Sequence, residues 1–111
     1  MIIIFALNGA LLGSELTLAT DAPRRITARG IAGEPLQGME VIRNGEVVYA
    51  VAGEGRRDVT LSWADMEDLQ RLAPVREISG ERFAYYYIRV RTATGALGWS
   101  SPIWVHIAEE A

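Results

Sequence analysis

The sequence predicts an all-β fold, an antiparallel β-sandwich of about seven strands. Stretches rich in β-branched and aromatic residues recur roughly every 8–12 residues, with turn residues such as Asn-Gly between them. Only residues 65–72 have the apolar spacing of a helix. The 111 residues are enough for one compact domain. We therefore expect a single domain over residues 1–111 with at most one short helix.

The first strand is expected at Ile2 to Leu7, an unbroken apolar run that ends at the turn Asn8-Gly9. An edge strand of a free-standing domain normally alternates apolar and polar residues, so this run suggests burial on both faces. Either the strand crosses the core of its own domain, or a missing neighbour or a partner chain covers it. In the second case Ile2, Ile4 and Phe5 form an interdomain strand.

Five further strands are expected before the helix. Asn44-Gly45 is a strong hairpin signal, because both central residues of a type I′ turn need positive φ. Val59, Leu61 and Trp63 alternate with polar residues, which is typical of a half-buried strand. The five expected strands are Glu15 to Ala19, Ile26 to Arg29, Met39 to Arg43, Glu46 to Val51 and Asp58 to Trp63.

Residues 65–72 are the helical candidate. We expect Asp65 to cap this helix and Met66, Leu69 and Leu72 to share its buried face. A helix of about two turns is marginal alone, so its stability should depend on packing.

The stretch from Glu81 to Ile107 organises the fold, because it holds two of the three tryptophans and three of the four tyrosines. A strand is expected at Tyr85 to Arg91, a turn at Thr94-Gly95, and a return strand from Trp99 onward. A shift of one residue in register exchanges the two faces of a strand. The sequence therefore leaves open which of the three consecutive tyrosines is buried.

This hairpin is also expected to carry a cluster of aromatic and arginine side chains. If Arg89 and Arg91 share a face with the tryptophans, their guanidinium planes can stack on indole rings. That arrangement loosely resembles the Trp-Ser box of cytokine-receptor fibronectin type III domains. The alternatives are tryptophans that only fill the core or sheet surface, and an aromatic platform for sugar. The candidate residues are Tyr85, Tyr87, Arg89, Arg91, Trp99 and Trp104.

Composition argues against several classes of function. The net charge is −3 and the eleven basic residues, all arginine, are scattered, so we expect no nucleic-acid partner. No apolar run approaches the ~18 residues of a membrane span, and the N-terminal run lacks the basic start of a signal peptide, so we expect no membrane insertion. The chain has no cysteine, which removes thiol chemistry but leaves the compartment open.

No catalytic set stands out. His106 is the only histidine, and we expect it on a sheet face with no metal and no cofactor. Gly53-Glu54-Gly55 places a glutamate where a phosphate-binding loop needs bare amides. Asp65, Glu67 and Asp68 are typical of a helix start rather than of paired catalytic acids. We therefore expect that this chain is not an enzyme.

Three motifs occur in a distinctive order: NGALLGSE near the start, MEVIRNGEVV from Met39 to Val48, and YYYIRVRTATGALGWSSPIWV from Tyr85 to Val105. Together they resemble the C-terminal domain that follows the catalytic domain in metal-dependent hydrolases of the PHP (polymerase and histidinol phosphatase) type. The resemblance implies an immunoglobulin-like sandwich. It also implies that the histidine and carboxylate clusters that hold the metals lie in the other domain, so no catalytic residue is carried over to this chain.

The resemblance thus implies an excised or fragmentary accessory domain, whose partner is the PHP-type catalytic domain of a phosphoesterase. A free-standing module that binds glycan or protein through its aromatic surface is the alternative. A sandwich without its neighbour exposes apolar surface or a strand edge, so we also expect a homodimer.

Overall fold

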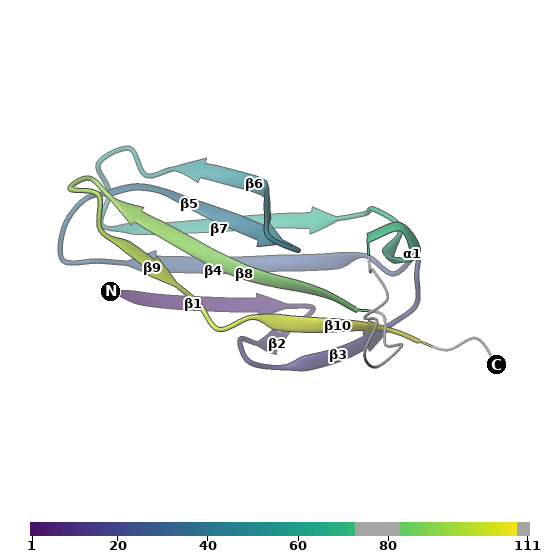
Figure 1. The fold of residues 1–111 in the computed structure, drawn as a ribbon. Helices are drawn as coiled ribbons and strands as arrows, with labels where there is room; N and C mark the ends of the chain where they lie inside the picture. The colour runs from purple at the N-terminus through teal and green to yellow at the C-terminus, as the bar shows by residue number, and fades with distance from the viewer. Residues whose placement is uncertain (73–82, 109–111) are drawn as a thin grey trace.

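The computed structural model describes residues 1–72 and 83–108. These residues form ten strands and one short helix (Figure 1). The elements are β1 (Ile2–Leu7), β2 (Ala10–Leu11), β3 (Glu15–Leu18), β4 (Arg24–Ile31), β5 (Leu36–Arg43), β6 (Glu46–Ala52), β7 (Asp58–Asp65), α1 (Leu69–Leu72), β8 (Phe83–Thr92), β9 (Leu97–Trp99) and β10 (Ile103–Ile107).

The strands form two sheets that pack face to face. Sheet A has the order β2-β1-β4-β7, and sheet B has the order β3-β10-β8-β5-β6, with β9 also paired to β8. Figure 1 shows β9 and β10 following one another along the same side of β8. The chain leaves sheet A after β2 and enters sheet B at β3, which runs parallel to β10. This order confirms the all-β, immunoglobulin-like sandwich, with seven strands of at least five residues and three shorter ones.

The core lies between the two sheets and is built by period-2 alternation. In β4, the side chains of Arg24, Ile26 and Ala28 face inward, while Arg25 and Thr27 are exposed. The same alternation runs through the whole of β8. Burying a large aliphatic or aromatic side chain contributes roughly 1.5–3 kcal/mol. The largest fully buried apolar side chains are Phe5, Leu7, Ile26, Leu36, Met39, Ile42, Leu69, Ile88 and Ile103.

The first strand alternates too, so it does not cross the core of its own domain with both faces buried. Phe5 and Leu7 are fully buried, whereas Ile2 and Ile4 are exposed on the outer face of sheet A. Phe5 is therefore a core residue and not part of an outward-facing strand surface. An all-apolar sequence hides this alternation, because both faces carry aliphatic residues.

The Asn44-Gly45 turn has the predicted backbone. Asn44 has φ of 52° and Gly45 has φ of 87°, and the turn joins β5 directly to β6 with Arg43 opposite Glu46. Asn44 also ties three elements together. Its side chain donates to the carbonyl of Leu72 at 2.6 Å and accepts from the amide of Tyr85 at 3.0 Å.

We expect Asn44→Gly to keep the hairpin but lower the free energy of unfolding by about 2 kcal/mol, because two side-chain hydrogen bonds are lost. Urea denaturation measures this difference. Glu54→Gly is the control: Glu54 also has positive φ, at 52°, so glycine should leave stability unchanged or raise it. Equal effects of the two substitutions would show that the Asn44 bonds to Leu72 and Tyr85 contribute nothing.

The helix is shorter than expected. It is a single turn, Leu69–Leu72, and Asp68 accepts from the amide of Gln70 at 2.8 Å. Asp65 is the buried last residue of β7 and does not cap the helix. Leu69 is fully buried as expected, but Met66 is 68% exposed. Asp65 is held in the sheet because its carboxylate has partners inside the domain.

The return strand is also broken in two. Ser100, Ser101 and Pro102 interrupt it between β9 and β10. Ser100 replaces the lost ladder contacts, since its amide donates to the carbonyl of Ile88 at 2.9 Å and its hydroxyl accepts from the Ile88 amide at 2.9 Å. The break lets β9 and β10 both follow β8.

Candidate functional site

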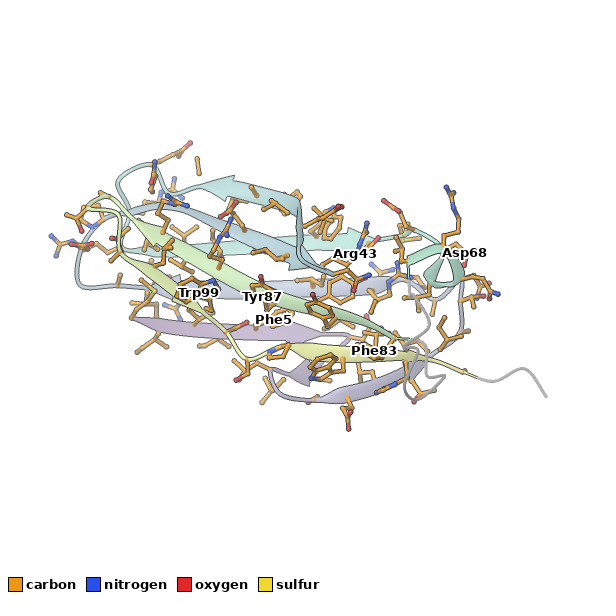
Figure 2. All side chains as sticks on the ribbon, viewed as in Figure 1. Phe5, Arg43, Asp68, Phe83, Tyr87 and Trp99 are labelled. Atoms are coloured by element: carbon orange, nitrogen blue, oxygen red, sulfur yellow. The ribbon has the colours of Figure 1, made fainter. Side chains whose placement is uncertain are left out.

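The outer face of sheet B collects the candidate residues. Alternation in β8 turns Tyr86 fully into the core and leaves Tyr85 and Tyr87 half-buried on the outer face, which settles the choice among the three tyrosines. Arg89 and Arg91 follow Tyr87 on the same face. Figure 2 shows Trp99, Tyr87 and Phe83 following one another along the length of this sheet.

The aromatic rings form a continuous cluster near one end of β8. Trp104 lies 5.4 Å from Tyr85 and 5.2 Å from Phe83, measured between ring centroids. Tyr85 and Tyr87 are nearly parallel, with their planes 6° apart and their centroids 6.5 Å apart. His106 extends the cluster beyond Phe83, and its Nε2 lies 3.3 Å from a carboxylate oxygen of Glu15. The rings are partly buried, and their mutual contacts help to stabilise the surface of the sheet.

Trp99 is separate from this cluster. It lies directly opposite Arg89 across β8 and β9, and it is 57% exposed. The Arg89 side chain bonds through Nε to Glu40 at 2.9 Å, and this hydrogen bond raises the pKa of Arg89. Trp104, by contrast, packs on aromatic rings. The register brings Arg89 and Trp99 together but does not place Arg89 with Trp104, and stacking of guanidinium on indole remains a prediction.

A shallow groove of about 350 Å³ lies next to this row, over β5 and β6. Its lining includes Gly38 and Ala50, whose lack of bulk leaves the sheet surface low, and the polar side chains of Gln37, Glu40 and Arg91. Arg91 forms no hydrogen bond or ion pair with another described residue.

A second, buried polar site was missed by sequence reasoning. Arg24 and Asp65 are 0% and 1% exposed, face each other across β4 and β7, and approach to 3.2 Å. The Asp65 carboxylate also accepts from the Tyr86 hydroxyl at 2.7 Å, from Arg43 at 2.8 Å and from the Glu67 amide at 3.1 Å. Figure 2 places Arg43 toward the α1 end of the sandwich. We call Arg24, Arg43, Asp65 and Tyr86 the buried polar cluster.

The electrostatics of this cluster favour an ionised carboxylate and a neutral phenol. Burial alone would raise the pKa of Asp65, but hydrogen bonds from Tyr86, Arg43 and the Glu67 amide, with the charge of Arg24, hold that pKa below its ordinary value. Burial raises the pKa of Tyr86 strongly, and the adjacent Asp65 carboxylate adds to the rise. The Tyr86 hydroxyl is therefore a fixed donor rather than an acid or base at neutral pH.

The outer face of sheet A carries a different surface. Ile2, Ile4 and Leu11 are 58%, 46% and 62% exposed. Leu11 lies opposite Ala6, two residues beyond Ile4 on the same face. We call Ile2, Ile4, Ala6 and Leu11 the aliphatic strip. Beside it, a shallow groove of about 400 Å³ runs over β4 and β7, and the exposed ion pair between Arg29 and Asp58 lies in this part of the sheet.

Within residues 1–72 and 83–108, no three His, Cys, Asp or Glu side chains group in a way that could hold a metal ion. Among the same residues, no helix has the length and apolar character needed to span a bilayer. These two findings concern only the described part of the chain.

The chain is similar to bacterial proteins of the genus Chlamydia that are described as uncharacterised. Proteins of Chlamydia muridarum and Chlamydia trachomatis are each 30% identical over 112 aligned residues, which cover 96% of this chain. An uncharacterised protein of Chlamydia pneumoniae shows the same identity and coverage. The chain spans only 18% of the length of these relatives. No protein-family model and no solved structure matches the chain.

Proposed function

We propose that this chain is a non-catalytic accessory domain of a longer protein, and that the aliphatic strip packs against a neighbouring domain. The observation that carries the proposal is the exposure of Ile2, Ile4 and Leu11 side by side on one sheet face. Aliphatic side chains grouped at a surface favour contact with another protein surface over contact with water. The much greater length of the chlamydial relatives supports the same proposal.

The proposed neighbour is the PHP-type catalytic domain that the sequence motifs suggest. The gene region that precedes Met1 in the source DNA should then encode, in frame, a domain of a few hundred residues rich in histidine. A stop codon directly upstream would remove this partner and leave the free-standing module.

The docking prediction uses calorimetric titration of this chain into that separately expressed domain. The native chain should bind, and Ile2→Ser with Ile4→Ser should weaken binding about tenfold or more, because two exposed aliphatic side chains leave the interface. Val47→Ser is the matched control: Val47 is 48% exposed, close to the 46% of Ile4, but lies on β6 in sheet B. Absence of a complex at several hundred micromolar, or equal loss with Val47→Ser, would contradict the docking surface.

A second candidate function is a binding module for glycan or protein on the outer face of sheet B. The observation in its favour is Trp99, whose indole is more than half exposed beside the Glu40–Arg89 pair. Tyr85 contacts the rings of both Tyr87 and Trp104, and all three residues are partly buried, so the more exposed Trp99 is the stronger ligand contact. A homodimer through the aliphatic strip also remains a prediction, which light scattering of the native chain tests directly.

A further inference from the structure

The groove over Gly38 and Ala50 is shaped by small residues rather than by a gap between strands. A Cβ on Gly38 would lie 3.0 Å from the carbonyl oxygen of Val51, so this position favours glycine. Glycine and alanine keep the floor low, while Gln37, Glu40 and Arg91 rise around it. The result is a polar depression on the sheet face, next to a register shift between Leu36 and Gly38.

The two arginines beside this groove differ in availability. Arg89 is engaged with Glu40 at 2.9 Å. Arg91 is exposed and has no hydrogen-bonding or ionic partner among the described residues. A guanidinium group presents a planar fork of N–H donors that matches a carboxylate in a bidentate contact. Among the residues that the structure describes, Arg91 therefore offers its guanidinium group to an anion.

An exposed apolar wall lies across β8 from the groove. Arg91 stands between Gly38 on β5 and Leu97 on β9, and the next row along places Arg89 between Glu40 and Trp99. Leu97 and Trp99 are 40% and 57% exposed. The distance from β5, which forms the floor of the groove, to β9 is two strand spacings, roughly 10 Å. That length fits a ligand of two linked sugar rings, one on the groove floor and one against the indole face.

We propose that this surface binds an acidic saccharide, with the carboxylate of one uronic acid on Arg91 and an adjacent ring against Trp99. The inference builds on the second candidate function and names its ligand class. Sugar hydroxyl groups can donate to the carboxylate of Glu40 and exchange hydrogen bonds with Gln37. The ionised side chains of an acidic peptide also offer carboxylates to Arg91, but they carry no hydroxyl donors for Glu40. A uronic acid can therefore pair its carboxylate with Arg91 and donate hydrogen bonds from its hydroxyl groups to Glu40 and Gln37.

The test is a titration of the ¹⁵N-labelled native chain with the tetramer of galacturonic acid, followed by NMR. Shifts are expected at the amides of Gly38 and Ala50, the side chain of Arg91 and the indole N–H of Trp99. Arg91→Gln should weaken binding roughly tenfold, the loss expected for one charge-assisted contact. Added salt should weaken binding further, because the site is exposed.

Arg57→Gln is the matched control, because Arg57 is another exposed arginine and lies in the loop between β6 and β7. It should leave binding unchanged. The fully methyl-esterified tetramer, with the same rings and no charge, should bind much more weakly than the acid.

The proposal is overturned by an absence of shifts at about 10 mM of the acidic tetramer, by equal binding of the ester, or by equal loss in both arginine variants. Binding of a hexaglutamate peptide without binding of the saccharide would assign the groove to an acidic peptide instead. Shifts confined to Tyr85, Tyr87 and Trp104 would keep a glycan-binding module but reject this groove. None of these outcomes bears on docking through the aliphatic strip.

Discussion

Asp65→Asn should destabilise the fold by about 3–5 kcal/mol, the cost of leaving a buried charge without its partner. Four donors converge on the Asp65 carboxylate: Arg24, Arg43, the Tyr86 hydroxyl and the Glu67 amide. An asparagine offers one acceptor oxygen and turns an NH₂ group toward the remaining donors. Arg24, which is fully buried, then keeps its charge without a compensating anion. Chemical denaturation followed by circular dichroism measures the loss.

Asp58→Asn provides the matched control for this prediction. Asp58 begins the strand that Asp65 ends, and it also pairs with an arginine, Arg29. Both members of that pair are about half exposed, so solvent screens the interaction and little change in stability is expected. Tyr86→Phe should fall between the two, at about 1–2 kcal/mol, because it removes one hydroxyl and leaves the charges paired. Equal losses for Asp65→Asn and Asp58→Asn would refute the role of burial.

The same cluster should limit stability at both ends of the pH range. The pKa of Asp65 is lowered in the folded state, so its contribution is present above the unfolded value of 3.8 and is lost as pH falls through the folded pKa. The pKa of Tyr86 is raised, so its contribution is complete below the unfolded value of 10.0 and declines as pH rises above it. When the free energy of unfolding is measured against pH, Asp65→Asn should reduce its dependence on pH in the acid range. Tyr86→Phe should reduce its dependence on pH in the alkaline range.

Part of the buried polar cluster could have been predicted from the sequence. The alternation of Val59, Leu61 and Trp63, extended by one step, places Asp65 on the buried face of β7. The same step backward from Ile26 places Arg24 on the buried face of β4. Two opposite charges at the inward ends of neighbouring strands predict a buried pair. Asp65, Glu67 and Asp68 indicated a helix start instead, because a helix cap is recognised from a few consecutive residues. The pairing of Arg24 with Asp65 joins two strands that are far apart in the sequence.

The remaining contacts of the cluster depend on packing that no local pattern records. Tyr86 is 62 residues from Arg24 in the chain, and Arg43 is 22 residues from Asp65. Three consecutive tyrosines fit either register of β8 equally well. The phenol at position 86 is the one whose hydroxyl reaches Asp65, and that contact explains why a polar group can occupy the centre of the core.

For the outer faces of the sheets, the sequence predicted which strands form but not the groove on sheet B. Turn residues and alternation predicted the strands and the two-layer fold, since both are local signals. They also placed Arg89 and Trp99 in one hairpin. The groove at Gly38 was not foreseen, because it depends on β5, β6 and β8 lying side by side, with Gly38 opposite Arg91 and Ala50 opposite Glu40.

Gly53→Ala should lower the free energy of unfolding by about 3 kcal/mol, as expected when an added methyl group overlaps fixed backbone. A Cβ at this position would lie 1.8 Å from the carbonyl oxygen of Leu36 and 2.4 Å from its carbonyl carbon. The Gly53 amide also donates to Gln37 at 2.8 Å, which holds the end of β6 against the start of β5. Relief of the overlap must stretch this hydrogen bond or displace Leu36, a core residue that is 1% exposed. Urea denaturation of the variant and the native chain gives the difference.

Gly33→Ala separates this steric effect from the general effect of replacing glycine. A Cβ on Gly33 would meet no atom within 4 Å, and its backbone lies outside the left-handed region. Alanine there should leave stability unchanged or raise it by up to about 1 kcal/mol, because it restricts the unfolded chain. If both variants lose stability equally, the contact between Gly53 and Leu36 is not the cause. If only Gly53→Ala is destabilised, close packing of Gly53 against Leu36 holds the β6–β7 loop on β5. The sequence Gly-Glu-Gly indicates a loop but does not show this packing role, because the contact depends on β5 lying next to Gly53.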